Sequence, residues 1–479
     1  MEDVYSKLVE IFGSEYVSNK AVDLYPYSSD ATEAESHMPD FIVIPQNRDQ
    51  LVELVKFCNK YIIPIVPYIS GNNIGGLCIP EKAGIVVDFG KKMNKIIHVN
   101  EEMMYVLLEP GVTFGQLKKY LDENHQNLRY NYPFAPPTAG VVGNVLLSGM
   151  NNMSSKVGSM GDSINGLEVI SAEGDVIRIG SCFYGADEAD PDSWWCRYPM
   201  PDLMGLFVNW QGMTGLVTKC AVQLWPNLLY KKFYAALVFG MRDTAKVLRE
   251  IGKSEAVEDA TMFCIESIKM IFENYKTEKY PGEPDFALLM PIVAKTEKMM
   301  EAKEEILFSV INKLKEEGIN VKALDLEEFS KLFSLRTRCA IDLPSFVLPV
   351  NISSGLTWFG SYAPAHKLED LIEKTNEIYH KYNFSPMIYG KTMKSGHYAV
   401  FRLMINFNKF EEQEKVKELM NEIADVCIDA GCIPYKTPIW MTKKLRQKIN
   451  PGWLKLFEKV KKMMDPNNIF NPGRWNFDY

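Results

Sequence analysis

A short apolar run that ends in a glycine- and asparagine-rich loop constrains this chain more than any other feature. Residues 64–76 read PIVPYISGNNIGG. Glycine and asparagine tolerate the positive φ angles at which successive backbone N–H groups converge on one anion. The same residue types are also typical of an ordinary loop after a strand. The stretch alone therefore predicts either an anion cradle or a plain turn, and the segments that follow it favour the cradle.

These later segments are rich in glycine or proline and come in a fixed order. They are residues 106–113, 137–144, 158–162, 166–169, 205–207, 212–218 and 465–474. The series resembles the FAD-binding oxidoreductases of the vanillyl-alcohol oxidase and p-cresol methylhydroxylase type. The resemblance runs from Pro39 to Trp475, and it depends on order and spacing because each segment alone is short. It implies an FAD enzyme that acts on a small molecule.

Bulk composition bounds the class of protein. The 479 residues exceed the roughly 250–300 at which single hydrophobic cores stop growing, so two domains are expected. A formal charge of -8 argues against a nucleic-acid partner, which would need a basic face. No run of about 18 apolar residues predicts a membrane span. The first residues also lack the basic and apolar regions of a secretory signal.

The cysteines argue for a reducing compartment. They are nine in number, scattered, and without a Cys-x-x-Cys pair: Cys58, Cys78, Cys182, Cys196, Cys220, Cys264, Cys339, Cys427 and Cys432. A disulfide framework is not expected, nor is a zinc or iron–sulfur site. We therefore predict a cytoplasmic protein with no metal.

The pattern of apolar residues predicts an α+β fold in two parts. Before residue 226, short strands are expected at 41–44, 62–66, 84–88 and 104–108, with a helix capped by Thr113 and a hairpin at 169–178. After it, helices at 295–317, 366–382 and 411–430 alternate with strands at 286–293, 356–362, 387–392 and 398–406. We predict an FAD-binding domain of the p-cresol methylhydroxylase type over 1–228. A cap with an antiparallel sheet follows over 229–450, and the resemblance implies that 451–479 returns to the first domain.

The resemblance assigns the cofactor to the glycine-rich segments. No Gly-x-Gly-x-x-Gly opens a helix, which disfavours a Rossmann dinucleotide site. The predicted FAD-binding residues are Ser70, Gly71, Asn72, Asn73, Ile74, Gly75, Gly76, Pro137, Thr138, Gly140, Gly143, Asn144, Gly158, Asp162, Gly215, Val217, Asn471 and Arg474. For Asn471 and Arg474 the alternative is a turn set by the adjacent Pro-Gly pair.

The family often attaches FAD covalently through histidine or tyrosine. In this chain asparagines occupy the loop position where a histidine would serve. The second attachment point matches Phe401, with His397 four positions earlier and expected on the same strand face. We therefore predict non-covalent FAD.

Three residues near the C-terminal end of the cap, Tyr435, Lys436 and Thr437, resemble the Tyr-Arg-Thr-His segment that binds a phenolate in the vanillyl-alcohol oxidase group. A tyrosine hydroxyl and a cation would stabilise an oxyanion beside the flavin. Lysine lacks the planar fork of arginine, and Pro438 stands in place of the histidine. Ile74 matches the position of a second phenol-binding tyrosine. A simple 4-alkylphenol is therefore not assured as substrate.

His397 and Arg402 complete the predicted catalytic set with Tyr435 and Lys436. An arginine above a flavin could hold a carboxylate, and a histidine could take a hydroxyl proton as hydride leaves. The two residues fall on opposite faces of one strand, so a single pocket does not obviously hold both. A rim histidine and a structural ion pair are the alternative interpretations.

Two subgroups of the resembled family contribute to the functional prediction. The glycolate oxidase and D-lactate dehydrogenase branch has a His-x-Gly-Asp-Gly-Asn-x-His metal motif that this chain lacks, yet residues 205–215 have that branch's length. We predict FAD-dependent removal of hydride from a phenolic or other aromatic alcohol. Alternatives are a metal-independent 2-hydroxy-acid dehydrogenase, a flavoprotein subunit that reduces a cytochrome or an electron-transfer flavoprotein, and a flavin-free binding protein. The resemblance also leaves a homo-oligomer open.

Overall fold

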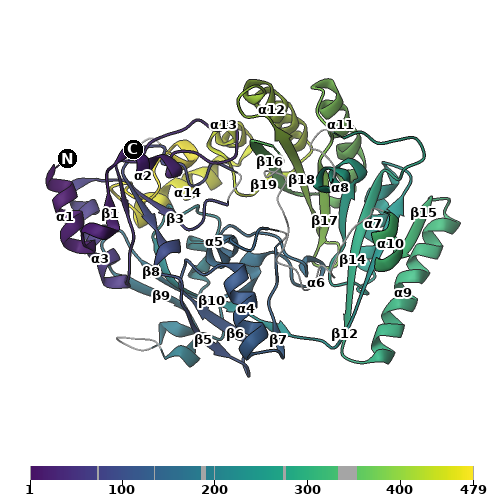
Figure 1. Ribbon diagram of the computed structural model, residues 1–479, viewed down its shortest axis with the longest axis horizontal. Coiled ribbons are helices and arrows are strands. Elements are labelled where there is room, and N and C mark those ends of the chain that lie inside the picture. Colours follow the sequence, from purple (N-terminus) through teal and green to yellow (C-terminus); the bar gives the residue numbers. More distant parts are fainter. Residues whose placement is uncertain are drawn as a thin grey trace.

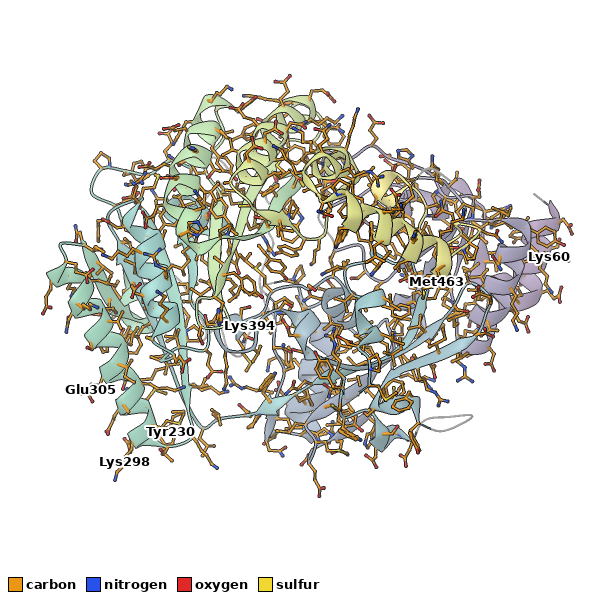
Figure 2. All side chains as sticks on the ribbon, turned by 180° about the vertical axis from the view of Figure 1, so that it is seen from behind. Lys60, Tyr230, Lys298, Glu305, Lys394 and Met463 are labelled. Atoms are coloured by element: carbon orange, nitrogen blue, oxygen red, sulfur yellow. The ribbon has the colours of Figure 1, made fainter. Side chains whose placement is uncertain are left out.

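The computed structural model describes residues 2–72, 75–133, 135–184, 190–198, 200–272, 277–332 and 353–477. Asn73 and Ile74, two of the predicted cofactor residues, lie outside the described residues. Figure 1 shows the chain folded into two halves, with the N-terminal half carrying α1–α6 and the cap carrying α7–α12. In Figure 2, seen from behind, Lys60 and Lys298 mark opposite ends of the molecule, and Lys394 lies between the two halves.

The N-terminal half contains two sheets. The first has the order β1-β2-β4-β3, with β2, β4 and β3 parallel, and the second has the antiparallel order β5-β6-β10-β8-β9. The strands are β1 (Val17–Ser18), β2 (Phe41–Val43), β3 (Ile65–Tyr68), β4 (Ile85–Asp88), β5 (Ile96–Asn100), β6 (Tyr105–Leu108), β8 (Ile164–Ile170), β9 (Val176–Gly180) and β10 (Leu216–Gln223). The helices are α1 (Glu2–Phe12), α2 (Ala21–Leu24), α3 (Arg48–Tyr61), α4 (Phe114–Asn124), α5 (Val141–Leu146) and α6 (Ser154–Val157). A short pair of strands, β7 (Leu128–Arg129) and β11 (Trp225–Pro226), joins this half to the cap.

The cap is an eight-stranded antiparallel sheet of order β15-β12-β14-β13-β17-β18-β16-β19. Its strands are β12 (Tyr230–Val238), β13 (Thr261–Cys264), β14 (Phe286–Ala294), β15 (Val321–Asp325), β16 (Gly355–Ala363), β17 (Ile388–Met393), β18 (Tyr398–Phe407) and β19 (Ile433–Pro434). Its helices are α7 (Asp243–Lys253), α8 (Ile265–Phe272), α9 (Glu297–Glu316), α10 (Leu326–Leu332), α11 (Leu368–Lys381) and α12 (Gln413–Asp429). Figure 1 shows α9, α11 and α12 on the outer side of this sheet.

Side chains alternate along the cap strands and thereby separate two environments. On β18, Phe401, Leu403 and Ile405 are buried in a core formed with α7, α9, α11 and α12. Val400 and Met404 belong instead to a smaller cluster that includes Met150 of the N-terminal half. The face of the sheet opposite to the helices is therefore directed toward the N-terminal half.

The C-terminal segment returns to the first sheet after α13 (Ile439–Lys448) and α14 (Pro451–Met464). Phe470 forms a parallel bridge with Ile65 of β3, and the backbone N–H of Ile65 donates to the carbonyl of Ile469 at 2.7 Å. The buried Lys461 ammonium pairs with Asp465 and also donates to the carbonyl of Met213 at 2.9 Å. These contacts join α14 and the residues after it to the N-terminal half.

Several sequence predictions are confirmed and one is wrong. Thr113 caps α4 in a capping box, and the hairpin of β8 and β9 turns at Gly174 with φ +85°. The strand predicted at 62–66 instead begins at Ile65, because Ile62 ends α3 in the left-handed conformation. In the part of the chain that the structure describes, no helix is long and apolar enough to span a membrane.

Candidate functional site

A cavity lies beside the C-terminal end of β3, where the glycine-rich segments meet. Its empty volume is about 1240 Å³, part of which is open to solvent. The wall includes the loop after β3, both ends of α5, residues 211–217 and the returning C-terminal segment. Most of the lining surface is apolar, and no carboxylate is among the described lining residues.

Nine of the predicted cofactor residues line this cavity. They are Ser70, Gly71, Asn72, Gly140, Gly143, Asn144, Gly215, Val217 and Asn471. Lys436, which was predicted as a catalytic residue, also lines it. Segments up to 401 residues apart in the sequence, from Ser70 to Asn471, thus share one wall.

The other described cofactor candidates make different contacts. Pro137 and Thr138 are exposed, and the Thr138 hydroxyl accepts a hydrogen bond from Asn72 Nδ2 at 3.0 Å. Asp162 caps a short turn at Ser159 and forms an ion pair with Lys394 at 2.9 Å. A Cβ at Gly158 would lie 2.4 Å from Lys394 Cε, so this glycine permits the close approach of the lysine.

Arg474 supports the cavity from behind. Its buried guanidinium donates to the carbonyls of Gly76, Leu77 and Ile79 at 3.0, 2.8 and 2.7 Å. Gly75 and Gly76 border a separate pocket with Arg474, while Leu77 lines the cofactor cavity. Arg474 therefore holds the loop that forms the wall and is absent from the lining itself.

Two glycines bring the main chain close to this wall. A Cβ at Gly140 would lie 2.7 Å from Ile69 Cγ2, and one at Gly212 would lie 2.7 Å from Pro67 Cγ. Gly212 also has a φ of +74°, a conformation that side-chain-bearing residues adopt at a cost. Both positions therefore exclude larger residues for steric reasons.

Gln211 is a site residue that sequence reasoning missed. Its carbonyl accepts from Asn471 Nδ2 at 2.7 Å, and its Nε2 donates to the carbonyl of Thr437 at 3.1 Å. It has a left-handed φ of +53° just before Gly212. The sequence signal that could have identified Gln211 is its position as a polar residue directly before Gly212 of the 212–218 segment. Gln211 connects the cavity to the segment that carries Tyr435 and Lys436.

The residues of the cavity fit FAD. Asn144 Nδ2 is buried and, in the described part of the chain, has no hydrogen-bond partner, while its residue lines the cavity. A free donor in a mostly apolar wall suits a flat ring with carbonyl acceptors. The glycines leave main-chain surface exposed to the cofactor, and the absence of described carboxylates avoids repulsion of a pyrophosphate.

A second group of residues lies on the face of the cap sheet that is opposite to the helices. Arg402 Nη2 donates to the hydroxyl of Tyr435 at 2.6 Å. Arg402 on β18 is the direct strand partner of Gly360 on β16. The N–H of Tyr435 donates to the carbonyl of that same glycine at 3.2 Å. A Cβ at Gly360 would lie 3.3 Å from the Tyr435 ring. Strand register and a glycine thus bring the two side chains together.

Aromatic rings surround the Arg402 guanidinium. Its central carbon lies 3.7 Å from the ring centre of Trp358 and 5.3 Å from that of Tyr389. Tyr389 is its direct partner on β17, and directly opposed residues share a face. Tyr362 stacks on Tyr435 with ring centres 5.1 Å apart. Arg402 therefore occupies an aromatic pocket that is only partly buried.

Arg402 and Lys436 have no carboxylate partner among the described ion pairs, in contrast to a nearby lysine. Lys391 on β17 is fully buried and forms an ion pair with Asp259 at 2.6 Å. Arg402 Nε is buried and, among the described residues, without a hydrogen-bond acceptor. An unpartnered buried donor of a cation indicates a site for an anionic group.

Burial and charge alter the titration of this group. Burial raises the pKa of Tyr435, although the neighbouring Arg402 opposes the shift. Burial, with a smaller contribution from Arg402, lowers the pKa of Lys436 to about 7. Tyr435 is therefore a neutral hydrogen-bond donor near neutral pH, and Lys436 exchanges its proton there.

The structure separates His397 from this group. His397 is exposed and belongs to the turn between β17 and β18, so the alternation of the strand does not orient it. Phe401, matched to a covalent attachment point, is buried against the cap helices on the opposite face from Arg402. None of the described lining residues of the cavity is a histidine or a tyrosine.

A cavity that fits FAD, together with a cap built on an antiparallel sheet, defines the class as FAD-dependent oxidoreductases with the p-cresol methylhydroxylase-type fold. A family model described as an FAD binding domain matches residues 39–180, and one described as the C-terminal domain of FAD linked oxidases matches residues 230–475. The chain belongs to the FAD-linked oxidases, and FAD is its cofactor.

Relatives of this chain differ in their substrates. It is 26% identical over 477 residues to a glycolate oxidase subunit of Bacillus subtilis, covering 99% of this chain and 96% of the relative. It is 26% identical over 503 residues to the flavoprotein subunit of a Pseudomonas putida 4-cresol dehydrogenase, with 98% and 95% covered.

Two solved structures share the fold. A p-cresol methylhydroxylase with bound substrate superposes with a TM-score of 0.85 at 23% identity, covering 100% of this chain and 98% of that one. A 4-ethylphenol oxidase from Gulosibacter chungangensis superposes with a TM-score of 0.86 at 17% identity, covering 99% and 96%. The enzyme is thus an FAD-dependent oxidoreductase, and its substrate must be argued from the site.

Proposed function

We propose that the enzyme removes a hydride from the hydroxyl-bearing carbon of an aromatic substrate, with an anionic oxygen of that substrate bound by Arg402 and Tyr435. The hydrogen bond of 2.6 Å between these two residues, in a pocket of aromatic rings, carries this proposal. Arginine and a tyrosine hydroxyl together stabilise an oxyanion more strongly than either does alone. Trp358, Tyr362 and Tyr389 supply flat apolar surfaces for an aromatic ring.

The roles of the side chains follow from their positions. Bound FAD supplies a hydride acceptor in the cavity. Arg402 Nε and the Tyr435 hydroxyl hold the anionic oxygen, which orients the substrate toward the cavity lined by Lys436. In the sequence-based hypothesis Lys436 was the cation of this pair, and Arg402 takes that role in the present proposal. We also propose that FAD is held non-covalently, which the asparagine-rich loop and the position of Phe401 support.

A 2-hydroxy acid is the second candidate substrate. A carboxylate accepts two parallel hydrogen bonds from an arginine, and the buried Arg402 Nε, beside Nη2, has no acceptor among the residues that the structure describes. The glycolate oxidase relative supports this class. An aryl-substituted 2-hydroxy acid satisfies both the cation and the aromatic walls, so a substrate panel must include it.

The route of the electrons after flavin reduction is also a proposal. One relative is named as a flavoprotein subunit, which supports transfer to a partner protein such as a cytochrome or an electron-transfer flavoprotein. Hydrogen peroxide formation in air would instead indicate an oxidase. A homo-oligomer and a cytoplasmic location remain parts of the same proposal, based on the resemblance and on the cysteine content.

The test is anaerobic reduction of the flavin by a panel of alcohols, followed by visible absorbance. The panel contains 4-hydroxybenzyl alcohol, benzyl alcohol, mandelate and glycolate. We expect 4-hydroxybenzyl alcohol or mandelate to bleach the flavin at least about tenfold faster than benzyl alcohol, which has no anionic oxygen to bind. Equal rates for benzyl alcohol would contradict the anion-binding role of Arg402.

Tyr435→Phe supplies the matched variant, because it removes one hydroxyl and leaves the ring stacked on Tyr362. We expect kcat/KM to fall about 10- to 100-fold, with the FAD content unchanged. Tyr198→Phe, on an exposed tyrosine, is the control and should behave as the unmodified enzyme.

A further inference from the structure

We propose that the side chain of Lys436 is the base that takes the hydroxyl proton of the substrate while the hydride leaves. This role rests on the proposed function. It assigns the base of the reaction, which neither Arg402 on β18 nor His397 in the turn before it supplies. Lys436 is the described residue common to the cofactor cavity and the group around Trp358. Its ammonium nitrogen lies 5.4 Å from the centre of the same indole that contacts Arg402.

The backbone fixes Lys436 at this junction. Its φ of +53° is left-handed, which turns the chain sharply between Tyr435 and Thr437. The N–H of Tyr435 is held by the carbonyl of Gly360, and the carbonyl of Thr437 is held by Gln211 Nε2. A residue anchored on both sides in a costly conformation is a prepared functional position.

The charges around Lys436 favour its neutral form. Arg402 acts on it from β18. The described titratable groups nearby are Tyr435 and Tyr389, which contact Arg402, and Cys78, which lines the same cavity as Lys436. Burial raises the pKa of each of these three, so they stay uncharged near neutral pH and cannot neutralise an ammonium. Burial and Arg402 together lower the pKa of Lys436 to about 7.

A comparison of the polar groups near the site supports the Lys436 amine as the proton acceptor. An arginine guanidinium cannot accept a proton, and a neutral tyrosine hydroxyl already carries one. Lys391 is fully buried in its ion pair with Asp259, and His397 is exposed in a turn. Among the described residues of this site, the Lys436 amine therefore combines a lone pair with a position on the cavity.

The chemical step balances without a further reagent. The O–H bond of the substrate breaks and its proton bonds to Lys436 Nζ. The C–H bond breaks and its electron pair and hydrogen pass as hydride to FAD, while the C–O bond becomes a carbonyl. The ammonium then releases its proton when the product leaves. A base poised near the working pH is the most effective in such a step.

The first test compares Lys436→Ala with Lys436→Arg in anaerobic flavin reduction across pH. We expect both variants to lose about 10²–10⁴-fold in rate, because neither offers a base, although arginine keeps the positive charge. In the unmodified enzyme the rate should rise with pH through about 7, and this rise should be absent in both variants. Lys443→Ala, at an exposed position on α13, is the control. Retention of the rate and of the pH dependence by Lys436→Arg would overturn the proposal.

Added amines give the second test. We expect methylamine and ethylamine to restore reduction in Lys436→Ala in proportion to their free-base concentration, and to leave Lys436→Arg unchanged because its side chain fills the space. Rescue that follows total amine rather than free base would contradict proton transfer.

A third measurement does not depend on turnover. Competitive acetylation of the holoenzyme, read by mass spectrometry, gives the titration midpoint of each lysine. We expect a midpoint near 7 for Lys436; a midpoint above 10 overturns its role as base. Failure of the proposed function would appear differently, as an unmodified enzyme whose flavin no hydroxylated aromatic reduces.

Discussion

The cofactor cavity and the pocket around Arg402 are built by different means. The cavity wall combines apolar side chains with glycines, and glycines such as Gly140 and Gly212 are required there because a single added Cβ would clash. The pocket is formed by side chains that reach each other only through the register of β16, β18 and the segment after β19. The cavity therefore depends on positions that have no side chain, whereas the pocket depends on the functional groups that its side chains carry.

This difference explains how each part responds to change. The cofactor cavity tolerates few substitutions at its close-packed glycines but accepts variety elsewhere, so relatives with different substrates can share it. A side-chain pocket can change its chemistry through the replacement of a single functional group. The predictions below test whether binding of FAD and selection of substrate are separable in this way.

The largest effect is expected at Arg402. Arg402→Met should lower kcat/KM for an anionic substrate about 10²–10³-fold, because a preorganised charged donor is lost. FAD content, measured by absorbance of the purified protein, should not change. Arg402→Lys keeps the charge without the planar fork, so its kcat/KM should lie between those of Arg402→Met and the unmodified enzyme. Loss of FAD in Arg402→Met would break the proposed separation.

Arg474 tests a side chain that supports the wall of the cofactor cavity. Arg474→Met leaves the buried carbonyls of Gly76, Leu77 and Ile79 without their donor, at a cost of about 3 kcal/mol in unfolding free energy. We expect a lower Tm and a lower FAD content after gel filtration. Arg242→Met, at an exposed ion pair, should shift neither. Full FAD retention in Arg474→Met would show that the loop keeps its shape unaided.

Gly212→Ala should have a smaller effect. The left-handed φ and the approach to Pro67 together cost about 1–2 kcal/mol, which corresponds to roughly tenfold weaker FAD binding. Gly205→Ala is the matched control, because a Cβ there has nothing within 4 Å. Titration of the apoprotein with FAD measures both. Equal affinity in the two variants would refute the steric account of the cavity.

The smallest effect is expected at Glu33, which is buried beside Arg474 and Trp440. Burial raises its pKa, so the folded protein retains a proton that the unfolded chain releases near 4.5. The free energy of unfolding therefore falls as pH rises from 4.5 through the folded-state pKa. Glu33→Gln should remove this contribution. The Tm of the variant should therefore exceed that of the unmodified enzyme by more at pH 8 than at pH 4.5. The same shift in Glu35→Gln, at an exposed position, would argue against burial as the cause.

Sequence reasoning reached the cavity more fully than the pocket, and the reason is physical. Glycine at a close approach has few substitutes, so the residue type itself marked Gly140, Gly143 and Gly215. Gly158 and Asp162 also come from a glycine-containing segment, but Asp162 forms an ion pair with Lys394 and Gly158 lies against that lysine side chain. Composition alone does not distinguish a turn from a wall. Arg474 was expected near the flavin, and the structure shows its guanidinium bound to the carbonyls of the loop that forms the cavity wall.

The pairing of Arg402 with Tyr435 could not be read from the sequence. These residues are 33 positions apart, and their contact depends on β16 lying between β18 and β19 with Gly360 at the crossing point. The alternation along β18 correctly separates Arg402 from Phe401, since these lie on opposite faces. It does not extend to His397, which precedes the strand.

The return of the C-terminal segment has a consequence for biosynthesis. Asn471 lines the cofactor cavity and Arg474 fixes its wall, while Ile469 and Phe470 extend the sheet at Ile65. A ribosome makes these residues some 400 positions after the glycine-rich loop. The nascent chain can therefore fold its first sheets early, but it cannot complete the FAD cavity until translation passes Arg474. Cofactor loading is thus a late event, and it acts as a checkpoint that only chains translated through this segment can pass.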